Sequence, residues 1–288
     1  MRHGRAADRT ARWFRIASCA AAIAVHGCAS TPAARYDGFA VDLGLHREIV
    51  EGRGYVHAVY ARAFAAGGES LHVYLESDGS PWIGETRVAE DPTPSEPVAL
   101  ELLRADPSPA VLVGRPCYHG LKPASGCDPR LWTSARYSEE VVASMASAVQ
   151  RVAERHRARR LVLIGYSGGG TLAMLLAERV ANVRALITVA GNLDTDAWTR
   201  LHGYTPLTGS LNPARRAPLP PHISQLHLAG GRDRNVPVAL VESAIRRQPN
   251  VQVRVYEEAD HGCCWTRRWP QILEAIAQQG ELAAEGAR

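Results

Sequence analysis

The chain has 288 residues, of which 46% are hydrophobic and 22% are charged. This balance excludes an intrinsically disordered or collagen-like protein, because enough apolar side chains are present to bury a core. The formal net charge is +4, but the basic residues, all arginine except Lys122, are scattered along the chain. A protein that binds nucleic acid needs a concentrated basic face, so we expect no nucleic-acid partner.

The first 27 residues have the pattern of a bacterial export signal. A segment with five arginines and one aspartate precedes an apolar stretch from Ile16 to Gly27 that is too short to cross a bilayer. The sequence Val25-His26-Gly27-Cys28 resembles the lipobox of bacterial lipoproteins, which implies that Cys28 is lipidated and becomes the N-terminus. Ordinary signal-peptidase cleavage nearby and an uncleaved N-terminal anchor are the alternatives. Residues 16–19 also fit a lipobox, but no apolar run precedes them.

Export would remove most of the net charge. Taking the five arginines and the aspartate of this segment from the 33 basic and 29 acidic residues leaves 28 of each. We therefore expect a nearly neutral protein on the periplasmic side of a bacterial envelope membrane, held there by a lipid anchor. A soluble periplasmic or secreted protein is the alternative.

The first half of the mature chain shows strand patterns and one short helix. Residues 28–50 have no clear period and are predicted to be a tether, followed by a single domain over residues 51–288. Alternating apolar residues predict strands over 55–64 and 71–77, joined as an antiparallel hairpin. Residues 91–105 begin with prolines and acidic residues and predict a short helix, and the apolar run in 110–115 predicts a buried strand.

Four cysteines remain after the signal region. Cys117 and Cys127 bracket a loop rich in Gly and Pro, and in an oxidising compartment they are candidates for a disulfide. Cys263 and Cys264 could form a vicinal bridge, remain thiols or share in longer pairings, and the sequence leaves these open. The chain has no C-x-x-C pair and no H-E-x-x-H motif, so we expect no metal site and no cofactor.

The second half alternates between strand and helix patterns. Strands are predicted over 160–167, 184–190, 223–230 and 251–258, and helices over 138–156, 169–180, 236–248 and 265–279. This alternation predicts an α/β fold with a mostly parallel central sheet and helices on both faces. The proline-rich residues 191–222 break the pattern. They are predicted to be a lid-like insertion, with a rigid surface excursion as the alternative.

The motif that carries chemistry is Gly165-Tyr166-Ser167-Gly168-Gly169. A bare G-x-S-x-G is a weak signal, but here the serine lies directly between a predicted strand and a predicted helix. This is the arrangement of a nucleophile elbow, in which glycines permit the sharp turn and the helix start directs backbone N–H groups toward developing negative charge. Ser167 is therefore the candidate nucleophile.

From residue 55 onward the chain resembles the α/β-hydrolase family, and specifically bacterial exported hydrolases with a GYSGGG elbow. The resemblance implies a triad in the order serine, acid, histidine. Gly230 to Pro237 is similar to the acid loop of the family and points to Asp233, with Asp194 and Asp196 as rivals. Glu257 to Gly262 resembles the histidine loop and points to His261. Asp260 is interpreted as structural, because adjacent loop residues rarely face each other.

The same resemblance implies an oxyanion hole. One donor would be the backbone N–H of Gly168, and the second would come from the loop after residues 71–77. There Asp78-Gly79-Ser80 stands where the family has a His-Gly turn, and we favour Ser80 over Gly79. Four aromatic residues are candidates for lining an acyl pocket, although loop aromatics more often pack: Trp82, Tyr118, Trp132 and Trp198.

These residues predict a serine hydrolase that cleaves a carboxylic ester through an acyl-enzyme. The partner is a small-molecule acyl substrate, together with the membrane through the lipid anchor. Amides, peptides and thioesters use the same triad, so an amidase, peptidase or thioesterase is an alternative. A non-catalytic envelope lipoprotein or binding module on the same scaffold is the alternative from another class.

Overall fold

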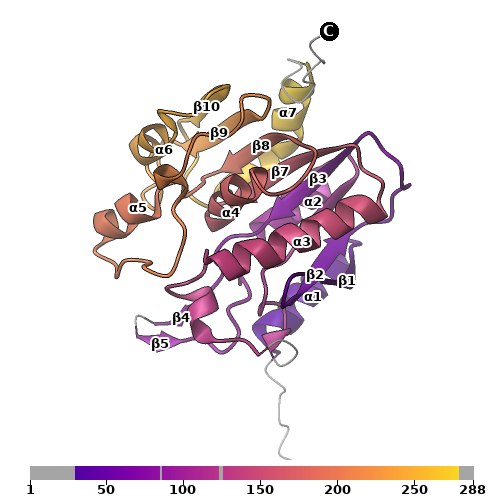
Figure 1. The fold of residues 1–288 in the computed structure, drawn as a ribbon, viewed down its shortest axis with the longest axis horizontal. Helices are drawn as coiled ribbons and strands as arrows, with labels where there is room; N and C mark the ends of the chain where they lie inside the picture. The colour runs from indigo at the N-terminus through magenta and orange to yellow at the C-terminus, as the bar shows by residue number, and fades with distance from the viewer. Residues whose placement is uncertain (1–29, 85, 123–125, 279–288) are drawn as a thin grey trace, which may run out of the picture.

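The computed structural model describes residues 30–84, 86–122 and 126–278, shown in Figure 1. Cys28 and the export signal predicted over residues 1–27 lie outside the described residues. In the described ranges, no helix is both long enough and apolar enough to span a membrane.

Within the described residues, the centre of the fold is an eight-stranded sheet in the order β1-β2-β6-β3-β7-β8-β9-β10. β2 pairs antiparallel with both β1 and β6, and every neighbouring pair from β6 to β10 is parallel. The strands are His46–Glu51 (β1), Val56–Ala61 (β2), Ser70–Leu75 (β3), Ala110–Val113 (β6), Arg160–Tyr166 (β7), Val183–Val189 (β8), Ser224–Gly230 (β9) and Val251–Tyr256 (β10). A separate small hairpin pairs Trp82–Ile83 (β4) with Arg87–Val88 (β5).

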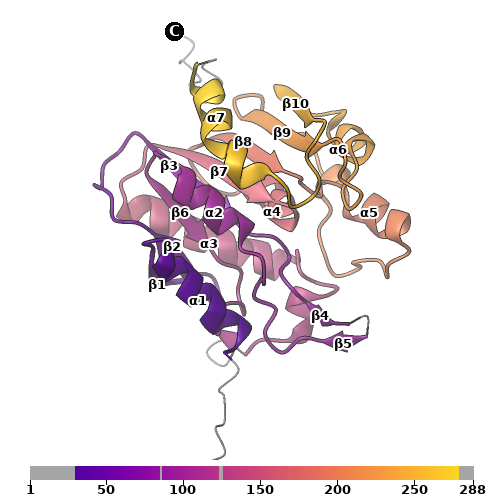
Figure 2. The same cartoon turned by 180° about the vertical axis from the view of Figure 1, so that it is seen from behind.

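Helices cover both faces of the sheet. The face toward the viewer in Figure 1 packs against α3 (Glu139–Arg155), α4 (Gly168–Ala177) and α6 (Val238–Ile245). The opposite face, seen in Figure 2, packs against α1 (Pro32–Asp42), α2 (Val98–Ala105) and α7 (Trp265–Gln278). The predicted α/β architecture with a mostly parallel sheet is confirmed.

Apolar periodicity explains why these segments take these positions. In α3, Val141, Met145, Val149 and Val152 recur at helical spacing and are all buried, and the Ser138 side chain accepts a hydrogen bond from the Val141 N–H at the helix start. In contrast, β7 is buried without interruption from Leu161 to Tyr166, as expected for a central strand covered on both faces.

The prediction of a tether over residues 28–50 is wrong for residues 32–50. Residues from Pro32 onward form α1, whose Ala33, Tyr36 and Ala40 are buried against the sheet, and β1 follows as the edge strand. The Thr31 side chain accepts a hydrogen bond from the Ala34 N–H and so begins the helix. The segment belongs to the domain because its one apolar stripe covers the face above β2.

The predicted hairpin of residues 55–64 with 71–77 is also corrected. Both segments are strands, but β2 forms its hairpin with β1, while β3 pairs parallel with β6 and β7. The position beside β3 is taken by β6, so β3 is surrounded by parallel neighbours and its carboxyl end joins those of β6 and β7.

The connection over residues 191–222 contains regular structure that its composition concealed. It begins with α5 (Thr195–His202), capped by the Asp194 side chain and ended by Gly203 with a φ of 66°. A short 3-10 helix, Pro213–Arg215, follows. The Leu211 N–H donates to Tyr137 O, and the Tyr137 N–H donates to Ser210 Oγ, so the connection is tied to the start of α3.

The cysteine loop is closed by a disulfide between Cys117 and Cys127, with Cα atoms 5.7 Å apart. Cys117 is buried in the same core as α3, so the bridge fixes this loop to the domain interior. The structure also joins Cys263 to Cys264, the vicinal pairing among the alternatives left open.

Three buried histidines carry strongly shifted pKa values. Burial lowers the pKa of His57 to about 4 and those of His119 and His227 to about 3. His57 Nδ1 and Nε2 lie 2.8 Å from Gly114 O and Ser144 Oγ, so this histidine is held neutral in the interior. Burial raises the pKa of Glu76 to about 7.

These shifts predict loss of stability in mild acid. Below pH 6.5 the unfolded chain protonates the three histidines while the folded chain does not, so the free energy of unfolding falls by up to about 1.4 kcal/mol per pH unit for each. Glu76 acts in the opposite direction between about pH 4.5 and 7, but a single group offsets only one histidine. Urea unfolding at pH 7 and pH 5 should show the loss.

His227→Gln should reduce the loss of unfolding free energy between pH 7 and pH 5 by the contribution of one histidine. His222→Gln is the control, because His222 is exposed. An unchanged pH dependence in the His227 variant would contradict the assignment.

Candidate active site

Ser167 lies in the turn between β7 and α4, as the motif predicts. Its φ is 53°, a left-handed conformation that is uncommon for a residue with a side chain and is found where the surroundings enforce it. Its N–H donates to Val189 O at 2.9 Å, and its carbonyl accepts from Gly170 N and Asn192 N. The neighbouring strand thus holds the turn.

The glycines on either side of Ser167 allow the chain segments to approach closely. A Cβ built on Gly165 would lie 2.2 Å from Gly169 O, and one built on Gly169 would lie 2.1 Å from Leu75 O. Both contacts are with backbone, which has no rotamer to change. Glycine is therefore required at both positions.

The structure brings Ser167, His261 and Asp233 together from three loops at the carboxyl ends of β7, β9 and β10. His261 Nε2 lies 2.9 Å from Ser167 Oγ, and His261 Nδ1 lies 2.8 Å from Asp233 Oδ2. The other carboxylate oxygen of Asp233 accepts hydrogen bonds from the N–H groups of Asn235 and Val236, each at 2.8 Å. The buried carboxylate is thus fixed in orientation, while the His261 side chain remains 23% exposed.

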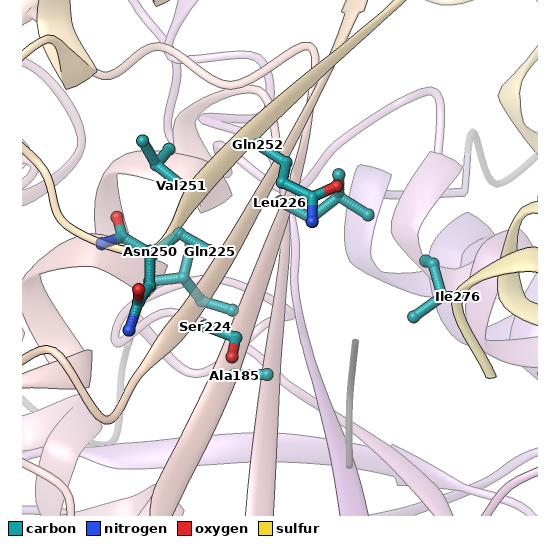
Figure 3. Close-up of a pocket in the computed structure, with 9 residues that line it drawn as sticks. Ala185, Ser224, Gln225, Leu226, Asn250, Val251, Gln252 and Ile276 are labelled. Atoms are coloured by element: carbon teal, nitrogen blue, oxygen red, sulfur yellow. The ribbon is translucent and has the colours of Figure 1, made fainter. Parts of the chain in front are cut away.

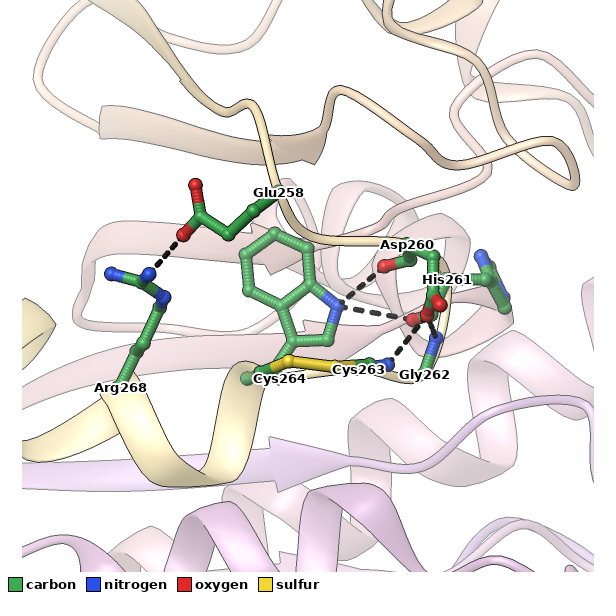
Figure 4. Close-up of a disulfide and its surroundings, with 8 residues drawn as sticks. Glu258, Asp260, His261, Gly262, Cys263, Cys264 and Arg268 are labelled. Carbon is green, nitrogen blue, oxygen red and sulfur yellow. Dashed lines mark hydrogen bonds and ion pairs between the residues drawn. A yellow bond between two sulfur atoms is a disulfide. The ribbon is translucent and has the colours of Figure 1, made fainter.

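The histidine loop is held by groups that the sequence prediction missed. Trp265 Nε1 donates to the carbonyls of Asp260 and His261, and Tyr166 OH donates to His261 O at 3.1 Å. Figure 4 shows Asp260 turned toward the N–H groups of Gly262 and Cys263, from which its Oδ1 accepts. Asp260 therefore shapes the loop, as interpreted, and does not orient the imidazole. Trp265, four residues after His261, is the sequence feature from which this support of the loop could have been predicted.

The rival acids do not approach His261. Asp194 caps α5 by accepting from the N–H groups of Asp196 and Ala197, and Asp196 forms an ion pair with Arg215. Both carboxylates are engaged by the connection over residues 191–222, in which Asn212 bridges them.

Of the two predicted oxyanion donors, only Gly168 has a backbone N–H that is available. Gly168 is the first residue of α4, where the N–H groups have no acceptor within the helix, so its amide is available beside Ser167. The Ser80 N–H instead donates to Pro92 O at 2.9 Å, and the Gly79 N–H to Ser77 Oγ at 3.3 Å. The prediction of Ser80 as the second donor is therefore wrong. Its N–H already forms the hydrogen bond that closes the loop carrying β4 and β5.

A cluster of charged side chains that the sequence prediction missed lies beside Gly168. Asp78 forms ion pairs with Arg115 at 2.6 Å and Arg136 at 3.0 Å, and both guanidinium groups are buried. Tyr137 OH lies 2.6 and 2.7 Å from the two Asp78 carboxylate oxygens. Burial opposes the charged form, but Arg115 and Arg136 hold the pKa of Asp78 below its ordinary value, so the carboxylate stays ionised.

The four candidate aromatic residues take different positions. Trp132 and Tyr118 are fully buried, with Trp132 Nε1 donating to Ala89 O and Tyr118 OH donating to Asp78 O. Trp198 Nε1 donates to Asn235 Oδ1 in the acid loop, which links α5 to the site. Trp82 lies in the β4–β5 hairpin and is 42% exposed. Packing and hydrogen bonding account for the first three.

A cavity of about 310 Å³ lies away from this site. Figure 3 shows its lining at the amino ends of β8, β9 and β10, with Ala185, Ser224 and Val251 among the lining residues. Ser167, Asp233 and His261 follow the carboxyl ends of the strands, so this cavity is at the opposite end of the sheet. The described part of the chain holds no group of three or more His, Cys, Asp or Glu side chains placed to bind a metal ion.

The sequence model of the dienelactone hydrolase family matches residues 125–284. Comparison with curated proteins gives no match.

Similar solved structures share the α/β-hydrolase fold. An esterase of Pyrococcus furiosus is 16% identical, with 84% of this chain and 92% of that chain covered and a TM-score of 0.53. An acylaminoacyl peptidase of Pyrococcus horikoshii is 11% identical over 88% of this chain and 45% of that one, with a TM-score of 0.57. A bacterial membrane phospholipase A is 17% identical over 88% and 92%, with a TM-score of 0.55. At these identities the likeness shows the fold alone.

The close approach at the elbow predicts a large difference between two Gly→Ala substitutions. Gly169→Ala should lower the free energy of unfolding by about 3 kcal/mol, because its Cβ meets backbone atoms that cannot move aside. Gly38→Ala is the control, since Gly38 lies exposed in α1 and a Cβ placed there would meet no atom within 4 Å. It should raise stability by about 0.5–1 kcal/mol. Urea unfolding followed by tryptophan fluorescence measures both, and a Gly169 variant as stable as wild type would refute the constraint.

Proposed function

Because this chain belongs to the dienelactone hydrolase family of α/β-hydrolases, we propose that it cleaves carboxylic esters through an acyl-enzyme on Ser167, with His261 as general base and Asp233 as its orienting acid. The observation that carries the proposal is the continuous hydrogen-bonded series from Asp233 through His261 to Ser167. Membership of the family indicates a hydrolase of ester-type bonds. The hydrogen-bonded residues supply the nucleophile, the general base and the orienting acid that serine catalysis requires.

The geometry supports a two-stage reaction. His261 Nε2 takes the Ser167 hydroxyl proton as Oγ bonds to the ester carbonyl carbon, and the carbonyl electron pair moves to its oxygen. The Gly168 N–H, at the positive end of α4, stabilises the oxyanion. Collapse breaks the bond to the alcohol, which leaves with the proton from His261. Water then attacks the acyl-enzyme by the same proton transfers and releases the acid.

Asp233 acts through its fixed orientation. Two backbone N–H groups hold Oδ1, which leaves Oδ2 to accept from His261 Nδ1 and to stabilise the imidazolium formed during attack. The hydrogen bond also selects the tautomer in which Nε2 is free to accept the serine proton.

We further propose that the protein is exported and anchored by a lipid on Cys28, with its domain on the periplasmic side of a bacterial envelope membrane. The basic segment, the short apolar run and the lipobox-like sequence support this location. The Cys117–Cys127 disulfide supports it independently, because such bridges persist in oxidising compartments. The substrate is then a small-molecule ester present in the envelope.

A fluorophosphonate probe tests the nucleophile. Wild type should be labelled and Ser167→Ala should not, and kcat/KM for p-nitrophenyl acetate should fall by at least about 10⁴-fold in the variant. Ser144→Ala is the matched control, because Ser144 also lies 2.8 Å from a histidine, His57, but is fully buried. It should keep its labelling. A folded wild type that is not labelled would support a binding module instead, and labelling of Ser167→Ala would assign another nucleophile.

Membrane fractionation of cells that express the full chain tests the anchor. Cys28→Ser should move the protein from the membrane to the soluble fraction, whereas Cys19→Ser, in the other lipobox-like sequence, should not. Metabolic labelling with a fatty-acid analogue should be lost in the Cys28 variant alone. An unchanged distribution of Cys28→Ser would rule out lipidation at this position.

A further inference from the structure

In the loop after β3, the backbone amide of Asp78 differs from those of Ser77, Gly79 and Ser80, which all have acceptors. The Ser77 N–H donates to Glu76 Oε1 at 2.9 Å, the Gly79 N–H to Ser77 Oγ and the Ser80 N–H to Pro92 O. No described residue accepts a hydrogen bond from the Asp78 N–H. Since buried backbone donors are almost always paired, an unpaired amide in a half-buried loop beside a nucleophile is a candidate for binding a transient oxyanion.

The side chain and carbonyl of Asp78 are held on all sides. Arg115, Arg136 and Tyr137 bind the carboxylate, and Tyr118 OH donates to the Asp78 carbonyl at 2.9 Å. Charge-assisted hydrogen bonds of this kind are short and strong, and their planar guanidinium groups restrict orientation. The peptide at Asp78 therefore has little freedom to rotate.

This cluster touches the nucleophile elbow directly. A Cβ built on Gly168 would lie 2.1 Å from Asp78 Oδ1 and 2.6 Å from the Tyr137 hydroxyl oxygen. The carboxylate therefore packs against the backbone of the residue that follows Ser167. It does not leave an uncompensated negative charge there, since two arginines pair with one aspartate.

We propose that Asp78 is the positioning residue of the oxyanion hole: its clamped side chain fixes the loop after β3 against Gly168, so that the Asp78 N–H is the second donor. The inference rests on the proposed function, because an oxyanion arises only if Ser167 attacks an acyl group. The proposal gives a role to Asp78, the residue at which the sequence departs from the His-Gly turn of the family. It also replaces Ser80 with Asp78 as the second oxyanion donor.

Substitutions that loosen the clamp should lower kcat and leave KM nearly unchanged. Asp78→Asn removes the ionic contacts and should reduce kcat by about 100-fold, the loss typical of one displaced oxyanion donor. Tyr137→Phe removes one contact and should reduce kcat by about 10-fold. The double variant should be no slower than Asp78→Asn, because Tyr137 acts through Asp78.

A second readout separates positioning from general destabilisation. A trifluoromethyl ketone forms a tetrahedral adduct whose oxygen occupies the oxyanion hole, so its Ki should rise by the same factor as kcat/KM falls in each variant. Asp106→Asn is the control, because Asp106 is a fully buried carboxylate bound by His72 and Tyr74, outside the site. It should lower the melting temperature while kcat stays within about twofold.

The outcomes are distinct. If Asp78→Asn and Tyr137→Phe keep kcat and Ki within about threefold of wild type while Ser167→Ala is inactive, the role of Asp78 is refuted and the proposed function stands. If Ser167→Ala stays active, the proposed function itself fails. Should Asp78→Asn not fold, Tyr137→Phe carries the test, since it keeps the aromatic ring packed over Arg115.

Discussion

The fold around the site depends on how closely the backbone of the elbow passes the ends of β3 and β8. Leu75 O and Val189 O face the turn at Gly169 and Ser167, so any added carbon atom at Gly169 would overlap a peptide group. This packing keeps Ser167 in a left-handed conformation that an isolated chain would rarely adopt. The energy for holding it comes from the buried strands on either side, and the hydroxyl is thereby directed out of the sheet toward His261.

The buried polar side chains differ in their charge state. His57, His119 and His227 are neutral and belong to the packing, whereas the Asp78 cluster stays charged because two guanidinium groups surround one carboxylate. Tyr137 connects that cluster to the long connection over residues 191–222 through Ser210 and Leu211. The same connection reaches the acid loop through Trp198 and Asn235. One segment therefore contacts both sides of the candidate active site.

Local features made much of this site predictable from the sequence. The elbow follows a strand whose apolar run is visible, so Ser167 was predicted from its motif and setting. Asp233 and His261 were predicted from the resemblance of their loops to those of α/β-hydrolases. The Asp78 cluster could not, because its partners are 37, 58 and 59 residues away. The Ser80 prediction failed for a related reason, since its amide bonds to Pro92 across a hairpin. Residues 32–50 were misjudged because β1 gains its stability from pairing with β2 and has little apolar pattern of its own.

The inclusion of α1 in the domain has a geometric consequence for a lipid on Cys28. Three residues, 29–31, separate such an anchor from Pro32, and the four Cα-to-Cα steps of a fully extended chain span only about 14 Å. An enzyme on so short a connection would stay against the bilayer and sample a narrow range of orientations. Encounters with its esters would then resemble a search within a thin layer at the membrane surface rather than diffusion through the periplasmic volume.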